Sequence, residues 1–322
     1  MYAWGGSTAG WKGSKKYDFG SARAKYDKAA IDAGATGTRT YTGKKVPNMD
    51  LVDPKGKTIR SGSTDPIIIA TDVTGSMAKS PGEFFDRLPL LYQTLAKYRP
   101  EAEFSFCAIG DATCDDYPLQ VNEFTKEIKD LESAVKALGC EGGGGGHITE
   151  SYELFGYFML KHCETPKATS PFLIIYGDET FYEEVEPRQT EHYIGDKLQA
   201  ALNSAELWKN LLQKFNVYFL QKPYGSGDSG TTREVKERWA GALGLQRVID
   251  VPDPERAGDV AMGLIAKNWG EYRDFSISLD ARHDDPDVKA SVHKSLRHVD
   301  ADPSVKSVTK GKKASKMTAP LV

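Results

Sequence analysis

The chain has 322 residues, of which 39% are hydrophobic and 27% are charged, and its formal net charge is -3 at pH 7. This composition is typical of a folded protein in water, with room for one large α/β domain and flanking extensions. The charge balance argues against a general affinity for nucleic acid or an anionic membrane surface, and no apolar run approaches the roughly 20 residues of a membrane span.

The N-terminus and the cysteines indicate a cytoplasmic protein. Residues 1–16 are rich in Gly, Ser and Lys and lack the apolar stretch of a secretory signal. The cysteines include no Cys-x-x-Cys pair, so we expect reduced thiols. They are Cys107, Cys114, Cys140 and Cys163. A zinc site at Cys140 and His147 is the alternative, but it lacks the paired spacing of zinc ligands.

The first part of the chain, residues 1–64, contains few aliphatic side chains and many Gly, Lys, Thr and Ser residues. We therefore expect an N-terminal arm that lies over the main domain. A weak apolar stripe predicts a short helix over 21–33. Residues 53–56, with the sequence Asp-Pro-Lys-Gly, indicate a turn between two short extended pieces.

From residue 65 to residue 279 the pattern changes to alternating strands and helices. Short β-branched or aromatic runs predict buried strands. These runs are 67–72, 103–109, 119–124, 172–176, 217–220 and 247–251. The segments between them carry the apolar spacing of a helix face. These segments are 80–98, 126–138, 149–163, 196–214, 233–243 and 254–269. Strands separated by helices predict a three-layer, doubly wound, Rossmann-like α/β fold with a mostly parallel sheet.

The segment 80–98 carries strong local signals. Ser80 is expected as the N-cap, with Pro81 at the first helical position and Glu83 three residues after the cap. Pro89 interrupts the apolar face, so we expect a kink there or a second helix that begins there.

Residues 280–322 are polar and Lys-rich, and we expect them to form a tail. Four lysines near its end form a basic patch suited to an acidic surface. They are Lys310, Lys312, Lys313 and Lys316.

Two of the predicted strands end in carboxylates. The strand at 67–72 ends in Asp72 and is followed by Thr74 and Ser76, which an extended chain places broadly on one side. The strand at 172–176 is followed by Asp178. In a doubly wound sheet these two strands lie side by side at the switch point, so both carboxylates face one crevice. Such hard oxygen ligands predict a site for Mg²⁺ or Mn²⁺.

The pattern Asp72-x-Thr74-x-Ser76 resembles the first loop of the metal-ion-dependent adhesion site (MIDAS) of von Willebrand factor A (VWA) domains. The resemblance covers about residues 65–270 and places Asp178 in the third loop of that site. The second loop of the family has a threonine after a glycine pair. Here His147 follows the glycine run, and Thr149 comes two residues later. Thr149 is a candidate ligand, and which of these two residues takes part stays open.

The resemblance implies a function in binding rather than in catalysis. An acidic side chain of a protein partner would complete the coordination shell of the ion. Cytoplasmic bacterial-type VWA proteins often act beside AAA+ ATPases or as assembly and scaffold factors, so we expect a partner of that kind.

The alternative is a metal-dependent phosphatase or phosphotransfer enzyme. A phosphatase of the haloacid dehalogenase type needs an acid two residues after its strand-end aspartate, where this chain has Thr74. A serine hydrolase needs Gly-x-Ser-x-Gly, which the surroundings of Ser76 lack. Without a convincing catalytic constellation, we expect no enzyme.

Several more acids lie near the predicted site in the sequence. We expect them mainly as solvated turn and surface residues, with a role in the outer metal shell or in partner selection as the alternative. They are Asp111, Asp115, Asp116, Glu179, Glu183, Glu184 and Glu186.

Overall fold

The computed structural model describes residues 41–299, except for 142–145, 226, 227 and 284, together with residues 24 and 28. The predicted helix at 21–33 and the lysines at 310–316 therefore lie largely or wholly outside the described residues. A six-stranded sheet forms the centre, with the strand order β12-β11-β7-β2-β3-β4. Its strands are β2 (Pro66–Asp72), β3 (Glu103–Ile109), β4 (Leu119–Val121), β7 (Phe172–Gly177), β11 (Asn216–Gln221) and β12 (Val248–Asp250).

All neighbouring strands in this sheet are parallel except β3 and β4, which form an antiparallel pair. Strands β2 and β7 lie in the middle and are buried at every residue. Their continuous apolar runs suit this position, because helices cover both faces of a parallel sheet. The predicted α/β fold with a mostly parallel sheet is thus confirmed.

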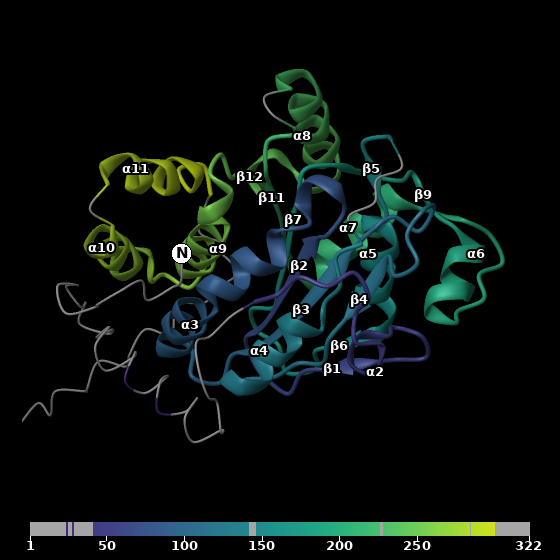
Figure 1. Ribbon diagram of the computed structural model, residues 1–322, viewed down its shortest axis with the longest axis horizontal. Coiled ribbons are helices and arrows are strands. Elements are labelled where there is room, and N and C mark those ends of the chain that lie inside the picture. Colours follow the sequence, from purple (N-terminus) through teal and green to yellow (C-terminus); the bar gives the residue numbers. More distant parts are fainter. Residues whose placement is uncertain are drawn as a thin grey trace, which may run out of the picture.

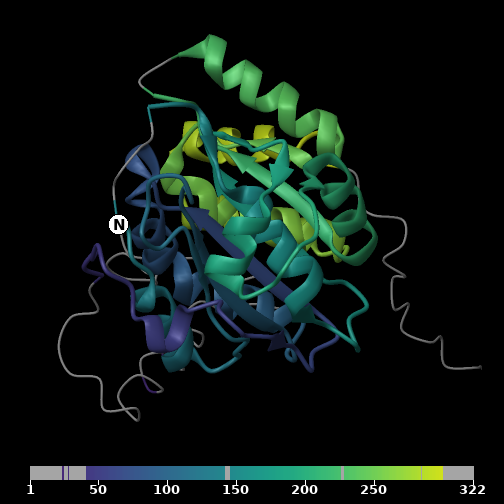
Figure 2. The same cartoon turned by 90° about the vertical axis from the view of Figure 1, so that its right-hand side faces the viewer.

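Two hydrophobic clusters lie on the two faces of the sheet (Figures 1 and 2). Ile67 and Ile69 belong to one cluster, whereas Ile68 and Ala70 belong to the other, as the alternation of a strand requires. Three helices pack on the first face: α3 (Ser80–Tyr98), α4 (Ile128–Ala137) and α9 (Ala257–Asn268). Three helices pack on the second face: α5 (Tyr152–His162), α7 (Ser204–Lys214) and α8 (Ser229–Leu243).

Shorter elements join these layers. Three two-stranded pairs are β1 (Ile59–Arg60) with β6 (Cys163–Glu164), β5 (Thr149–Glu150) with β8 (Thr180–Phe181), and β9 (Glu184–Val185) with β10 (Leu202–Asn203). The remaining α-helices include α2 (Met49–Val52), α6 (Pro187–Gln189), α10 (Tyr272–Arg282) and α11 (Pro286–Ser295). Val52 and Ile59 are fully buried, so residues of the predicted arm pack against the core.

Helix α3 differs from its prediction at its start, and no second helix begins at Pro89. The chain forms one helix from Ser80 to Tyr98, with Pro89 inside it. Ser80 is the first helical residue and makes no cap. Its hydroxyl instead donates to the carbonyl of Asp72 at 2.5 Å, which ties the start of α3 to the end of β2.

Three helices begin at residues other than the predicted 149, 196 and 233. In each case a local interaction explains the difference. Helix α5 begins only at Tyr152, because Thr149 and Glu150 pair with β8. Helix α7 begins at Ser204, where the Asn203 side chain accepts from the backbone of Glu206. Helix α8 begins earlier than predicted, because Asp228 accepts from two backbone N–H groups of its first turn.

The predicted tail also differs over residues 280–299. Helix α10 ends at Arg282, α11 follows, and both lie beside α9 (Figure 1). Val292, Leu296 and Val299 are buried in the first hydrophobic cluster. Val292 lies within α11, whereas Leu296 and Val299 follow its end, so a polar segment packs on the core through a few apolar contacts.

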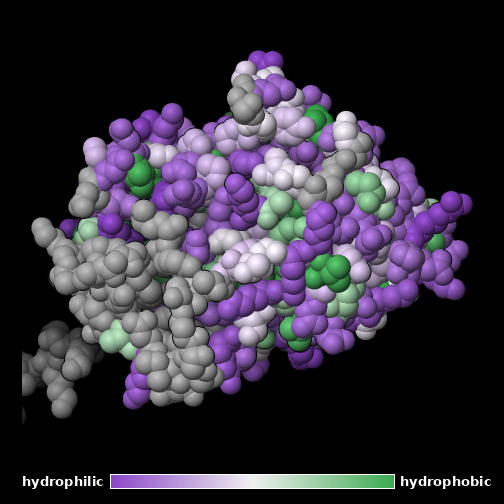
Figure 3. Space-filling view, viewed as in Figure 1, coloured by the Kyte–Doolittle hydropathy of each residue, from purple (hydrophilic) through white to green (hydrophobic). Residues whose placement is uncertain are grey.

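The surface has few apolar residues. Figure 3 shows a mostly hydrophilic face with small, separate apolar patches. Among the residues that the structure describes, the large hydrophobic ones that are exposed are Val46, Leu51, Leu202, Leu245 and Ile277. Among the described residues no helix is long and apolar enough to cross a membrane.

A buried ion-pair cluster fixes α10 to α9. The Asp259 carboxylate is fully buried and lies 2.9 Å from the guanidinium of Arg282, whose side chain is 1% exposed. Arg256 lies 3.4 Å from the other oxygen. Burial would raise the pKa of Asp259, but the contact with His283 and the charges of Arg282 and Arg87 hold it below its usual value.

We predict that Asp259→Asn lowers the free energy of unfolding by about 3–5 kcal/mol, because it removes one side of a buried charge pair. Urea unfolding near pH 7 measures this loss. Asp253→Asn is the matched control, since Asp253 is 40% exposed and contacts the same Arg256. Equal, small losses in both variants would contradict the prediction.

Candidate functional site

The two predicted carboxylates lie at the same end of neighbouring strands. Thr71 of β2 pairs with Tyr176 of β7 in parallel register, so Asp72 and Asp178 follow at the carboxyl ends of both strands. Both side chains are 0% exposed. The structure therefore brings together the acids that the strand order predicts to share a crevice.

Asp72 is held by donors on both carboxylate oxygens. Oδ1 accepts from the Thr74 backbone N–H at 2.8 Å and from the Thr74 hydroxyl at 2.7 Å. Oδ2 accepts from the Tyr152 hydroxyl at 2.6 Å. Tyr152 is the first residue of α5, so the late start of this helix places its hydroxyl against β2.

Asp178 has a different environment. Its Oδ2 accepts from the Ser76 hydroxyl at 2.5 Å and from the Lys222 ammonium at 3.1 Å. The ammonium also donates to the Ser76 carbonyl at 2.8 Å. Asp178 Oδ1 is buried and has no hydrogen-bond partner among the described residues. One carboxylate oxygen at this site thus lacks a donor or a cation.

Burial and the nearby charge of Asp178 change the protonation of Asp72. Burial, and then the charge of Asp178, raise the pKa of Asp72 to about 7. The hydrogen bonds from Tyr152 and Thr74 favour the charged form and oppose this rise. A cation at this end of the sheet would remove the repulsion between the two carboxylates.

Gly177 allows the close approach of Tyr152. A Cβ atom on Gly177 would lie only 2.0 Å from the Tyr152 hydroxyl oxygen. Any larger residue at 177 would therefore displace the hydroxyl from Asp72. Trp239 of α8 packs against the Tyr152 ring, with 5.4 Å between the ring centroids, and stacks on Phe219 at 4.2 Å. These aromatic contacts fix the position of the Tyr152 ring.

The residues predicted for the second loop make other contacts. The Thr149 hydroxyl lies 3.2 Å from the Thr180 hydroxyl, within the β5–β8 pair. His147 is exposed and its Nε2 lies 3.4 Å from Asp111 Oδ2. Among the contacts of the described residues, neither Thr149 nor His147 bonds to Asp72 or Asp178.

The expectation of solvated acids is wrong for three residues. Asp111, Asp115 and Glu179 are buried, whereas the other four are exposed. Asp111 accepts from the hydroxyl of Thr113 at 2.7 Å and from that of Tyr182 at 3.1 Å.

Glu150, which was not among the predicted site residues, is buried at this end of the sheet, as is Glu179. Burial, and then the charge of Asp72, raise the pKa of Glu150 to about 11.

The positions of two other site residues, Lys222 and Tyr152, could have been inferred in part from the sequence. Lys222 directly follows β11, the strand next to β7, and so must lie at the same edge of the sheet as Asp178. Tyr152 comes three residues after the candidate Thr149. Its role depends on where α5 begins, which the sequence pattern alone does not set.

No protein-family model matches the chain, and no curated protein matches it. Three solved structures with a similar arrangement are the pilus adhesin SpaC from Lactobacillus rhamnosus GG, proximal thread matrix protein 1 from the mussel byssus, and the VWA domain of SpRpn10. Their sequence identities are 13%, 12% and 12%, and the TM-scores are 0.46, 0.43 and 0.38.

The matches cover 66%, 66% and 62% of this chain, and 31%, 48% and 95% of those chains. This chain thus spans less than a third of the length of the first protein and about half of the second. Similarity at these values supports no argument about function. Any inference about function therefore rests on the geometry of the site.

Glu153 lies in the first turn of α5 and allows the effect of burial on an acid in this region to be measured. It is fully buried and accepts from the Tyr182 N–H at 3.0 Å, and burial raises its pKa from 4.5 to about 8. Between these values the folded chain holds a proton that the unfolded chain releases. The contribution of Glu153 to stability is therefore complete below about pH 4.5 and is lost as the pH rises through about 8.

We predict that Glu153→Gln, which is neutral at every pH, gains stability relative to the original chain as the pH rises from about 5 to 8. The gain should be on the order of 3 kcal/mol, at about 1.4 kcal/mol for each pKa unit. Urea unfolding at several pH values measures it, with exposed Glu184→Gln as the control. A difference that does not change with pH would contradict the prediction.

Proposed function

We propose that the carboxyl end of β2 and β7 is a VWA-like protein-interaction site that depends on Mg²⁺ or Mn²⁺. Asp178, Thr74 and Ser76 would hold the ion, with Asp72 orienting the Thr74 hydroxyl. The chemistry that the ion supplies is a bond to an acidic side chain of a partner protein. The observation that carries the proposal is the buried Asp178 Oδ1, which has no hydrogen-bond partner among the described residues.

The donor set fits a hard divalent cation. Its atoms are carboxylate and hydroxyl oxygens, which Mg²⁺ and Mn²⁺ prefer. No three His, Cys, Asp or Glu side chains gather as a metal site in the part of the chain that the structure describes. The proposed set places one carboxylate on the ion, and Mg²⁺ is usually bound by one or two carboxylates and keeps several waters. Thr149 remains a candidate ligand only if its bond to Thr180 breaks.

Lys222 supports the proposal and also limits it. Its ammonium contacts Asp178 and the Ser76 carbonyl, so a cation already lies at the edge of the oxygen set. Its side chain is 18% exposed and long enough to turn toward water. A divalent ion would therefore compete with Lys222 for Asp178.

The surroundings suit a protein partner. Ser76 is exposed beside the buried acids. The segment after β8 carries three exposed glutamates, Glu183, Glu184 and Glu186. Their charge would repel acidic proteins in general, so a partner would have to place its own carboxylate directly on the ion. An AAA+ ATPase or an assembly component is the kind of partner that the VWA resemblance implies. Cytoplasmic location is part of the proposal, because Cys114 is an exposed free thiol.

The geometry argues against Asp72 as the nucleophile of a phosphatase. Both of its oxygens accept hydrogen bonds from Thr74 and Tyr152. It is also fully buried, so a phosphoryl group would have to break these bonds before contact. The site is better suited to binding than to phosphoryl transfer.

We predict that Mg²⁺ or Mn²⁺ raises the melting temperature of protein first stripped with EDTA. With a dissociation constant of about 1 mM, about 10 mM metal stabilises by about 1.4 kcal/mol, or about 2–4 °C. Asp178→Asn should abolish the shift, because it removes the charge that holds the ion. Differential scanning calorimetry measures it, and Asp280→Asn is the distant control.

Lys222→Met should strengthen metal binding by about tenfold, or about 1.4 kcal/mol, because it removes the competing ammonium. Lys209→Met on α7 is the control, since Lys209 is exposed and pairs only with Glu206 among the described residues. No metal response in the original chain or in Lys222→Met would contradict the metal site. A response lost in Lys222→Met would contradict the competition.

We also predict that partner capture from the native host requires the ion. Ser76→Ala and treatment with EDTA should each abolish capture, while the circular dichroism spectrum stays unchanged. Adding back Mg²⁺ in excess of EDTA should restore it for the original chain only. A complex that survives chelation at full affinity would show that the contact does not pass through a metal.

A further inference from the structure

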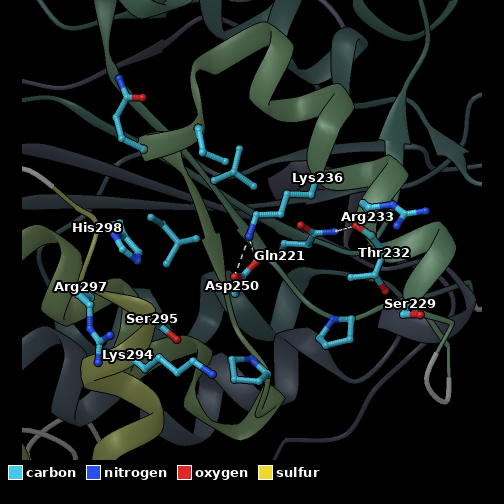
Figure 4. Close-up of a pocket in the computed structure, with 16 residues that line it drawn as sticks. Gln221, Ser229, Thr232, Arg233, Lys236, Asp250, Lys294, Ser295, Arg297 and His298 are labelled. Atoms are coloured by element: carbon cyan, nitrogen blue, oxygen red, sulfur yellow. Dashed lines mark hydrogen bonds and ion pairs between the residues drawn. The ribbon is translucent and has the colours of Figure 1, made fainter.

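A second concave site lies away from the candidate metal site. It has a volume of about 970 Å³ and lies between α8, the edge strand β12 and the end of α11 (Figure 4). None of the candidate metal residues lines it. Its size is at the upper end of the range of small-molecule sites in proteins.

The floor of this pocket is apolar. Val248 and Ile249 of β12 line it, together with Leu245 and two prolines. Leu245 is 65% exposed, the highest value among the large hydrophobic residues of the described chain. An exposed leucine beside a concave apolar floor indicates a surface that a ligand with an apolar body would cover.

The rim of the pocket is basic on both sides. Figure 4 shows Arg233 of α8 on one wall and Lys294, Arg297 and His298 on the opposite wall. All four side chains are exposed, and none forms an ion pair with a residue that the structure describes. Asp250 is the one carboxylate of the lining, and Lys236 neutralises it through contacts of 2.8 Å to both oxygens.

The deep wall carries a polar atom that lacks a partner. Gln221 is 2% exposed, and its Nε2 donates to the Thr232 carbonyl at 2.7 Å. This bond fixes the amide so that Oε1 is an acceptor. Oε1 is buried without a hydrogen-bond partner among the described residues. A buried acceptor without a donor destabilises the protein, so a ligand that brings an N–H group would gain affinity there.

We infer that this pocket binds a small organic anion with a flat apolar body, an N–H donor and a phosphate group. The apolar floor takes the body, Gln221 Oε1 accepts from the donor, and the two basic walls bind the charge. A nucleoside phosphate has all three features. An acidic peptide fits less well, because β12 offers only three residues as an edge for strand pairing.

The test is isothermal titration calorimetry of the full chain with adenosine monophosphate, adenosine and inorganic phosphate. We expect one site for adenosine monophosphate and at least about tenfold weaker binding of the other two, since each lacks one half of the contacts. The double variant Arg233→Gln with Arg297→Gln should weaken binding at least about tenfold, through the loss of two charge-assisted bonds. Both arginines are exposed, so this variant tests binding without disturbing the core.

Gln221→Met should weaken adenosine monophosphate more than inorganic phosphate, because only the former carries an N–H donor. Arg188→Gln, on the exposed surface of α6, is the control and should bind like the original chain. Binding should also persist in EDTA and in Asp178→Asn, which separates this pocket from the proposed metal site.

Three results would overturn the proposal. The first is no heat with adenosine monophosphate up to about 5 mM, a dissociation constant that corresponds to about -3 kcal/mol. The second is inorganic phosphate or a polyglutamate peptide binding as tightly as adenosine monophosphate. The third is binding of adenosine monophosphate that the Arg233 and Arg297 substitutions leave unchanged.

Discussion

The burial of two carboxylates side by side is the constraint on which the rest of the site depends. Asp72 and Asp178 lie at the ends of adjacent parallel strands and are fully buried. Without compensation their repulsion and desolvation would oppose folding. Each acid has its own donors. Thr74 and Tyr152 hold Asp72, and Ser76 and Lys222 hold Asp178. These donors come from three segments, namely the loop after β2, the start of α5 and the end of β11, so the acids link separate parts of the fold.

The aromatic side chains on the second face extend this linkage. Tyr152 reaches Asp72 only because residue 177 is glycine, and Trp239 packs behind its ring. The Trp239 N–H donates to the carbonyl of Glu179 at 2.9 Å and so fixes the loop that follows Asp178. A substitution in this aromatic cluster therefore acts on the carboxylates as well as on the core. The apparent stability and the binding competence of this end of the sheet should be linked for that reason.

Much of the fold followed from local patterns, whereas parts of the site did not. The strand-forming runs and their order place Asp72 and Asp178 together, because a doubly wound sheet brings these strand ends to one edge. The contact of Tyr152 depends on β5 delaying the start of α5, a tertiary effect that apolar spacing does not show. Glu150 was predicted to lie in a helix and Glu179 in a solvated loop, but the β5–β8 pair forms at this point of the chain and both acids are buried. Helix α11 was missed because its sequence is polar: Val292 is its buried apolar residue, and His293 holds it to Tyr272 and Asp280 of α10.

Lys222 decides how a metal and a partner would be coupled. A buried pair of carboxylates needs a positive group nearby, and the ammonium supplies one from within the chain. An arginine in its place would hold Asp178 through a rigid, bidentate contact, whereas a lysine is a point charge on a flexible stem. Displacement of Lys222 by a divalent ion would free an ammonium at the rim of the site, beside exposed Ser76. An acidic side chain of a partner would then meet two positive groups, the ion and Lys222. The same lysine that weakens the metal would thus strengthen the complex, which makes the two binding events cooperative.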